Sequence, residues 1–164
     1  MAHLSTSRQL FGLIGWFAVC SMAAVIGAVA SIDAGAFYTG LARPGWAPPP
    51  GVFGPAWTVL YALMAIAAWS IWRDGGFSAN RTALGLFLAQ LAVNALWSWL
   101  FFTWHLGGWA LTNILILIAL LIATLRAFWP ISRSAVFLLV PYLLWVGFAA
   151  VLNYAVWRLN PELL

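Results

Sequence analysis

Five long apolar segments constrain the fold of this chain more than any other feature of its sequence. A helix that crosses a bilayer needs about 20 mostly apolar residues, because the hydrocarbon core is about 30 Å thick and a helix rises about 1.5 Å per residue. The apolar runs are continuous rather than alternating, which favours helices over the short strands of a β-barrel. The five segments are residues 10–30, 55–72, 82–104, 109–128 and 134–157.

The connections between these segments are short, with one exception. Only residues 31–54, which include Pro48-Pro49-Pro50, form a long connection. Helices that follow one another across short connections pack as antiparallel neighbours. The sequence therefore predicts an all-α membrane protein, a five-transmembrane-helix bundle that forms a single domain over residues 1–164.

The composition excludes several other classes of protein. Hydrophobic residues make up 65% of the chain and charged residues only 6%, whereas about a quarter of an ordinary soluble domain is charged. The arginines are scattered singly, which argues against a nucleic-acid partner. Cys20 has no second cysteine, and the two histidines lie far apart, so we expect neither a disulfide nor a metal site. The three acids lie outside the middle of the spans, so we also expect no catalytic residue and no proton-coupled transport.

The arginines also predict an orientation. With five spans, Arg43 and Arg158 fall on one side of the membrane, and the other five arginines fall on the side of the N-terminus. Because cytoplasmic loops carry an excess of positive charge, we expect a cytoplasmic N-terminus. The absence of lysine and the abundance of alanine, arginine and tryptophan are typical of a bacterial source. We therefore expect a multi-pass protein of a bacterial cell membrane, and the sequence leaves undecided whether this is the inner or the outer membrane.

Aromatic rings and amides gather on single faces of three spans. Trp57 shares a face with Tyr61, because residues four apart in a helix are neighbours. The other two faces hold Gln90, Asn94 and Trp97, and then Tyr142, Trp145, Ala149 and Asn153. A buried amide in a membrane needs a hydrogen-bond partner, which is either another helix or a ligand. Two interpretations remain open: a well-packed core, or an aromatic-walled pocket for a flat, apolar ligand with polar edges.

Five stretches of the chain carry a resemblance to a known family. They resemble the translocator protein family, also called tryptophan-rich sensory proteins (TspO) or peripheral-type benzodiazepine receptors. The stretches are FYTGLARPGWAPP (37–49), VFGPAWTVLYALM (52–64), LGLFLAQLAVNALWSWLFF (84–102), GWALTNILI (108–116) and VPYLLWVGFAAVLNYAVWRLN (140–160).

The resemblance implies a five-helix bundle with a ligand pocket beneath a lid formed by residues 31–54. Members of the family bind tetrapyrroles, sterols and synthetic aromatic drugs of the benzodiazepine and isoquinoline carboxamide type. No obligatory cofactor is implied, and a porphyrin is expected as ligand. Trp57 and Asn94 are the implied polar contacts, and position 113 is often an acid in relatives. The implied ligand-binding residues are Tyr38, Trp57, Tyr61, Asn94, Trp97, Asn113, Trp145 and Ala149.

The resemblance also implies contacts outside the pocket. Leu152, Tyr154 and Arg158 fit a sterol-contact pattern, whose alternative interpretation is an ordinary aromatic and basic anchor at a helix end. Members of the family often dimerise, and Gly85 with Ala89 forms a face of small residues that lets two helices approach closely. A second such face is formed by Ala23 and Gly27. Many relatives carry a proline after the tryptophan at position 97, where this chain has Ser98.

Three functions are compatible with these features. The first is a membrane receptor or transporter-like protein that binds tetrapyrroles, sterols or drug-like aromatic ligands. The second is an enzyme that degrades porphyrin in a reaction that depends on light and oxygen. The third is a porphyrin-responsive sensor or regulator. We expect binding rather than catalysis, because the sequence offers no general acid, general base or metal.

Overall fold

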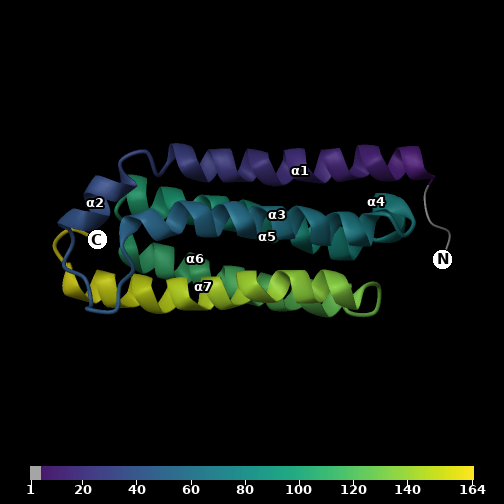
Figure 1. Ribbon diagram of the computed structural model, residues 1–164. Coiled ribbons are helices and arrows are strands. Elements are labelled where there is room, and N and C mark those ends of the chain that lie inside the picture. The colour runs from purple at the N-terminus through teal and green to yellow at the C-terminus, as the bar shows by residue number, and fades with distance from the viewer. Residues whose placement is uncertain (1–4) are drawn as a thin grey trace.

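A computed structural model describes residues 5–164 of the chain, and Figure 1 shows a bundle of long helices that lie side by side. The helical elements are α1 (Thr6–Val29), α2 (Ala34–Gly40), the 3-10 helix η1 (Pro50–Val52), α3 (Phe53–Trp72), α4 (Gly76–Ala79), α5 (Arg81–Ser98), the π-helix η2 (Trp99–Thr103), α6 (Gly107–Phe128) and α7 (Arg133–Leu159).

Five stretches of helix are long and apolar enough to cross a membrane, which confirms the predicted fold class. Their ends differ slightly from the prediction, since α1 begins at Thr6 and α7 ends at Leu159. The polar residues at the start of α1 add no hydropathy, but their backbone still forms helical hydrogen bonds, beginning with Gln9 N–H to the Ser5 carbonyl. The predicted loop 31–54 contains α2 and η1, and α3 already begins within it at Phe53.

The long helices form a closed ring. Going around the bundle, α1 packs against α3, α3 against α7, α7 against α6, α6 against α5, and α5 against α1 again. Figure 1 places α2 and the C-terminus at one end of the bundle and α4 and the N-terminal end of α1 at the other. We call these the lid end, with residues 30–52, 104–106 and 160–164, and the base end, with residues 73–80 and 129–132.

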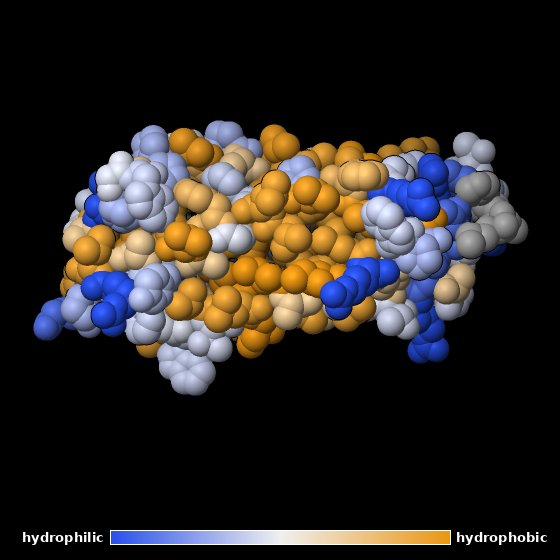
Figure 2. Space-filling model, turned by 90° about the horizontal axis from the view of Figure 1, so that it is seen from below, coloured by the Kyte–Doolittle hydropathy of each residue, from blue (hydrophilic) through white to orange (hydrophobic). Residues whose placement is uncertain are grey.

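The outer surface fits a membrane environment. Figure 2 shows a broad hydrophobic band across the middle of the visible face, with hydrophilic residues gathered towards the two ends. Large apolar side chains such as Phe11, Leu115 and Leu144 are exposed on the outside of the helices. The chain is therefore an integral multi-pass membrane protein, while the side on which its N-terminus lies stays a prediction.

The base half of the bundle is closed by small side chains. Ala65, Ala67 and Ala68 of α3 are fully buried. On α1, Gly12 lies directly under the ring of Trp72, because a Cβ at that glycine would stand 2.1 Å from a ring carbon. Trp72 lies at a span end, as an interfacial tryptophan does, but its ring is half-buried against α1. Helices α1 and α3 therefore approach closely at this point because Gly12 has no side chain.

A π-helical turn replaces the end of the third span. The α-helical part ends at Ser98, and in the following segment the Trp104 N–H donates to the Trp99 carbonyl at 2.9 Å. This wider turn lies where many relatives are expected to carry proline, and such turns often occur at functional sites. Thr103 then donates its hydroxyl to the Ala30 carbonyl at 3.1 Å, which fastens the turn to the end of α1.

Candidate ligand-binding site

Six aromatic rings form a continuous series of contacts from the lid end into the bundle. The ring of Tyr38 meets that of Phe53 edge-on at 5.4 Å, and Phe53 meets Trp145 at 6.1 Å. Trp145 in turn meets Trp57 edge-on at 6.5 Å. We call this series the aromatic column; its members are Tyr38, Phe53, Trp57, Tyr61, Tyr142 and Trp145.

The directions of the helices set the depth of each ring. Because α3 starts at the lid end, Trp57 lies one turn nearer the lid than Tyr61, and the two rings are 5.7 Å apart. Helix α7 runs the opposite way, so Trp145 is nearer the lid than Tyr142, whose ring meets Trp57 at 6.2 Å. Trp57, Tyr61 and Trp145 are half-buried, as is Ala149 one turn above Trp145. These four side chains pack against the buried core, on the helix faces that their spacing had grouped together.

Asn94 connects α5 to the column. Its side chain is buried, and its Nδ2 atom donates to the Tyr61 hydroxyl at 3.3 Å. The sequence left open whether this amide pairs with another helix or with a ligand. In the structure the partner lies on another helix, and the pairing places the Asn94 amide beside the ring that Trp57 also contacts.

A second polar pair lies one turn deeper. Tyr142 donates its hydroxyl to the Oε1 atom of Gln90 at 2.9 Å, and both side chains are fully buried. Gln90 lies one turn before Asn94 in α5, hence farther from the lid. This pair lies at the deep end of the column. Helical spacing had grouped Gln90 with Asn94 and Tyr142 with Trp145, without assigning Gln90 or Tyr142 to the site.

Trp97 lies outside the aromatic column, in the packing near the lid end. Its Nε1 atom donates to the Oδ1 atom of Asn153 at 3.1 Å, and its ring stacks on Phe101 at 5.4 Å. The Nδ2 atom of Asn153 donates to the Gly107 carbonyl at 3.0 Å. One buried amide thus ties α7 to both the end of α5 and the start of α6. Asn153 was visible in the sequence as an amide on the aromatic face of α7, but its partners are far from it in the chain.

Asn113 has a structural hydrogen bond rather than a place on the column. Its Nδ2 atom donates to the backbone carbonyl of Val93 at 2.9 Å, which joins α6 to α5. An ionised carboxylate at this position has no proton to donate to that carbonyl. The amide is therefore matched to its partner, and the implied ligand contact of Asn113 stays a prediction.

One set of contacts lies within the lid, and a second set joins the lid to the bundle. Tyr38 donates its hydroxyl to the Pro48 carbonyl at 3.2 Å, and the Arg43 guanidinium lies 4.8 Å from the centre of the Tyr38 ring. Burial raises the pKa of the Tyr38 hydroxyl, and the charge of Arg43 lowers it in part. The neutral hydroxyl that this bond requires is therefore the favoured form.

The second set is made by Asn160, which the sequence did not assign to any role. Its Oδ1 atom accepts from the Ala42 N–H at 2.9 Å, and its Nδ2 atom donates to the Ala42 carbonyl at 2.9 Å. We call this two-way contact the lid clamp. The ring of Phe37 also stacks on His105 at 4.2 Å, and His105 has a left-handed backbone with φ of 53°. The lid is thus fastened to the end of α7 and to the loop before α6.

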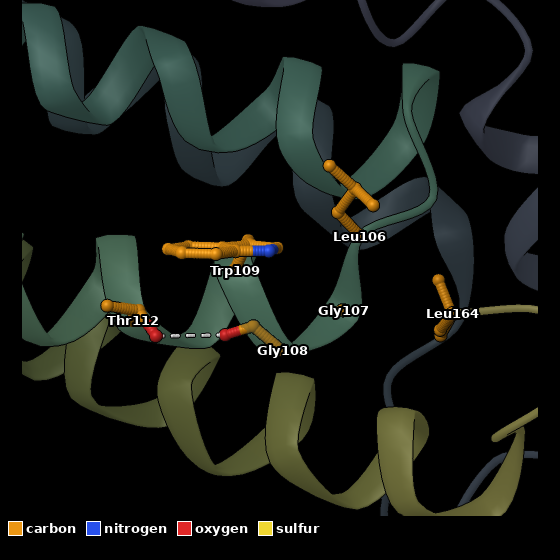
Figure 3. A pocket seen from close by; sticks show the side chains of 6 residues that line it. All are labelled: Leu106, Gly107, Gly108, Trp109, Thr112 and Leu164. Atoms are coloured by element: carbon orange, nitrogen blue, oxygen red, sulfur yellow. Dashed lines mark hydrogen bonds between the residues drawn. The ribbon is translucent and has the colours of Figure 1, made fainter.

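Two surface hollows lie away from the column. One, of about 310 Å³, lies between the start of α6 and Leu164, and Figure 3 shows Trp109 beside it. The other, of about 340 Å³, lies at the base end beside Arg81. In the column itself the rings contact one another, so a ligand that enters there must separate them. Within residues 5–164, no three His, Cys, Asp or Glu side chains gather as metal ligands.

The residues implied for sterol contact do not share a surface. Leu152 is buried in the bundle, whereas Tyr154 is 52% exposed and Arg158 lies at the exterior near the lid end. The predicted dimer face is accessible, because Gly85 has open space beside it and Ala89 is exposed. The second face of small residues, formed by Ala23 and Gly27, is buried against other helices of the same chain. A Cβ at Gly27 would stand 3.3 Å from the Ser98 hydroxyl of α5.

Comparison with known proteins places this architecture in a family. The model of the TspO/MBR family matches residues 16–158. The chain belongs to the TspO/MBR family. It is 41% identical to the Translocator protein of Homo sapiens over 126 residues, which cover 76% of this chain and 75% of the human protein.

Two bacterial relatives extend the match. The chain is 39% identical to Protein CrtK of Rhodobacter capsulatus over 159 residues, which cover 94% of this chain and 95% of that protein. It is 37% identical to the Tryptophan-rich sensory protein of Cereibacter sphaeroides over 145 residues, or 88% of this chain and 89% of that relative. The resemblance predicted from the sequence is confirmed, and the family supports a membrane receptor or transporter-like role.

Proposed function

We propose that this TspO-family membrane protein binds a tetrapyrrole such as protoporphyrin at the aromatic column beneath the lid. The observation that carries the proposal is the unbroken series of ring contacts from Tyr38 to Tyr142. Aromatic pairs gain about 0.5–1.5 kcal/mol beyond the burial of their area. A flat ligand that slides between these rings replaces ring-to-ring contacts with contacts of the same kind.

The polar groups beside the column suit the edges of such a ligand. Asn94 exchanges the Tyr61 hydroxyl for an oxygen or nitrogen of the ligand, so its hydrogen bond is replaced rather than lost. The indole N–H of Trp57 supplies a second donor on the facing helix. The carboxylates of a porphyrin remain near the lid, where Arg43 supplies a positive charge. Benzodiazepine and isoquinoline-type molecules fit the same column on the same grounds.

Two further ligand and partner proposals rest on the outer surface. We place sterol contact at Tyr154 and Arg158, which face outward, and leave Leu152 out of it because that side chain is buried. We place a homodimer contact at Gly85 and Ala89, whose small side chains allow a second helix to approach.

The test is a titration of the purified protein in phosphatidylcholine nanodiscs with protoporphyrin in the dark, followed by porphyrin absorbance. We expect saturable binding that Trp57→Phe and Asn94→Ala each weaken about tenfold, the effect of losing one good hydrogen bond in a dry site. Trp109→Phe is the control, because Trp109 is 67% exposed and lies outside the column. Binding that all three variants leave unchanged would place the ligand elsewhere.

The same samples test the alternative of porphyrin breakdown. Trp57 and Trp145 contact each other within the column, so a bound porphyrin lies beside two indole rings. Illumination in air that consumes porphyrin with the parent protein, but not with Trp57→Phe, would favour the enzyme. Equal loss in empty nanodiscs would leave the binding role as the function.

A further inference from the structure

The side chain of Gln90 has an unused hydrogen-bond donor in the centre of the bundle. Its Oε1 atom accepts from Tyr142, while its Nε2 atom is buried and has no hydrogen-bond partner among residues 5–164. The side chain is 0% exposed. Among residues 5–164, the Nε atom of Arg73 is also buried without a hydrogen-bond partner, but Arg73 lies at the base end.

An unused donor at this depth is costly. A buried polar group without a partner destabilises the folded protein, and the hydrocarbon region offers no bulk water to replace the partner. The oxygen of the Gln90 amide is already used by Tyr142, but that bond leaves the Nε2 donor unsatisfied. The donor therefore points to an acceptor that is present when the protein is occupied.

The place of Gln90 in the column indicates what supplies the acceptor. The ring of Tyr142, which Gln90 holds by its hydroxyl, is the deepest contact of Trp57. Asn94 lies one turn nearer the lid on the same face of α5, and its amide is already paired with Tyr61. A ligand that enters from the lid and reaches the Tyr142 ring arrives beside the free donor of Gln90.

The surroundings also restrict the chemistry of the acceptor. Helix α3 contains no charged residue, and the charged residues of α5 and α7 lie at the ends of these helices, so nothing near Gln90 on these helices balances a negative charge. A carboxylate at this depth would be desolvated without a counter-ion, which is unfavourable. A neutral acceptor such as a ketone or amide carbonyl gains the hydrogen bond without that penalty.

We propose that Gln90 is a specificity-determining residue that donates a hydrogen bond to a neutral carbonyl oxygen at the leading edge of the ligand. This inference rests on the proposed function, since it requires that the column opens to a flat ligand. It adds an orientation to that function: a flat aromatic ligand enters with a neutral carbonyl at its leading end. Charged groups of the same ligand remain towards the lid.

The experiment uses two flat probes that differ in one group. Fluorenone carries a ketone where fluorene carries a methylene, so their affinities differ mainly through that oxygen. Binding of each probe is measured in phosphatidylcholine nanodiscs and corrected for its partition into empty nanodiscs. We expect the parent protein to bind fluorenone about tenfold more tightly than fluorene, the size of one hydrogen bond to an otherwise unpaired donor.

Variants of Gln90, with a control elsewhere, separate the donor from the fold. Gln90→Met is made here and below in a Tyr142→Phe background, because it would otherwise free the Tyr142 hydroxyl to donate to the ketone. In that background it keeps the length of the side chain and removes the amide donor, so the preference for fluorenone falls to within about twofold, whereas Tyr142→Phe alone keeps the preference. Gln90→Asn keeps an amide but withdraws it by one methylene, and it is also expected to lose the preference. Thr124→Val is the control, because Thr124 is equally buried and donates its hydroxyl to the Leu120 carbonyl of its own helix. This control keeps the tenfold ratio.

A spectroscopic signature tests the hydrogen bond directly. The infrared carbonyl band of fluorenone lies at a lower frequency when the oxygen accepts a hydrogen bond. We expect this shift with the parent protein and with Thr124→Val, and not with Gln90→Met. An unshifted band with the parent, or the same preference in the parent and in Gln90→Met, overturns the inference and leaves a buried water as the partner of Gln90.

The protoporphyrin titration distinguishes this failure from failure of the proposed function. Protoporphyrin binding that Trp57→Phe weakens, together with equal affinities for fluorenone and fluorene, overturns only the role of Gln90. Absence of saturable binding for protoporphyrin and for both probes overturns the binding site and the role of Gln90 together.

Discussion

The two halves of α3 are built differently. Towards the lid end, Trp57 and Tyr61 are half-buried and contact other rings. Towards the base end, Ala65, Ala67 and Ala68 are fully buried in helix-to-helix contacts. One helix therefore combines a ring-lined half that can exchange partners with a half that holds the bundle together.

The polar side chains show the same contrast. In the base half, the Ser70 hydroxyl donates to the Ile66 carbonyl, and Thr124 bonds to its own helix in the same way. In the lid half, the amides reach across to other helices, as Asn94 does to Tyr61 and Asn153 does to Gly107. A hydroxyl satisfied within its own helix survives any movement of its neighbours. An amide that bridges helices senses such movement, which suits the half in which a ligand must separate side chains.

The largest expected loss of stability comes from removing a large buried side chain from the base half of the bundle. Phe87 is fully buried between the rings of Trp16 and Phe128. Phe87→Ala leaves a cavity and is expected to lower the free energy of unfolding by about 3–5 kcal/mol. Phe137→Ala is the control, since Phe137 is 65% exposed on α7, and it should cost about 0.5 kcal/mol or less. Detergent unfolding followed by circular dichroism measures both, and equal losses would contradict a closed base half.

A second prediction tests the close approach of α1 to α3. Gly12→Ala places a methyl group 2.1 Å from a ring carbon of Trp72, whereas Gly15 has no atom within 4 Å of the corresponding position. We expect Gly12→Ala to destabilise the protein by about 1–3 kcal/mol through overpacking. Gly15→Ala should stabilise it by about 0.5–1 kcal/mol, because alanine favours a helix over glycine. The same unfolding assay applies, and two stabilising substitutions would show that the Trp72 ring moves aside freely.

The contrast between the halves also explains what the sequence could predict. The five spans were evident from hydropathy, and helical spacing placed Trp57, Asn94 and Trp145 on inward faces. Those inferences need only the period of one helix and the thickness of a membrane. The resemblance added the family, which the comparisons confirm.

The remaining features depend on which helices are neighbours. Asn160 and Ala42 are 118 positions apart in the chain, and Asn153 and Gly107 are 46 apart, so no local pattern connects them. The π-helical turn after Ser98 was also missed, because its wider backbone turn has no distinctive residue pattern. Helical spacing places an amide on a face but does not name its partner.

The third prediction compares the asparagines that fasten the two ends of the bundle. Asn160→Ala removes the lid clamp and is expected to raise the amide exchange rate of residues 41–47 about five- to tenfold, corresponding to about 1–1.5 kcal/mol. Asn160→Asp keeps the acceptor for the Ala42 N–H and loses the donor, so its effect should be intermediate. Hydrogen exchange followed by mass spectrometry provides the measurement.

Asn80 supplies the matched control at the base end. Its Nδ2 atom donates to the carbonyls of Ile71, Asp74 and Gly76, so it fastens the loop between α3 and α5. Asn80→Ala should raise exchange at the base end and leave residues 41–47 unchanged. Faster exchange at both ends in both variants would mean that the bundle opens as one unit, which would remove the distinction between its halves.

The smallest expected effect concerns the Tyr38 hydroxyl in the lid. Tyr38→Phe removes its hydrogen bond to Pro48 and should raise exchange in residues 41–47 about two- to fivefold, since one such bond contributes about 0.5–1 kcal/mol. Tyr154→Phe, at an exposed tyrosine of α7, should leave the same segment unchanged. Equal exchange in Tyr38→Phe and the parent would show that the clamp alone closes the lid.

The same hydroxyl gives the lid a dependence on pH. Burial raises the pKa of Tyr38 in the folded protein above its ordinary value of about 10, despite the opposing charge of Arg43. Its contribution to stability is therefore fully present below about pH 10 and is lost as the pH rises through the folded pKa. The chain contains no lysine, so no ammonium side chain titrates in that range. The difference in phenolate absorbance between the parent and Tyr38→Phe, followed through a pH titration, isolates this group. We expect its midpoint to lie above that of N-acetyl-tyrosinamide. A midpoint at or below that reference would mean that Tyr38 is open to water and that the lid half is looser than its contacts indicate.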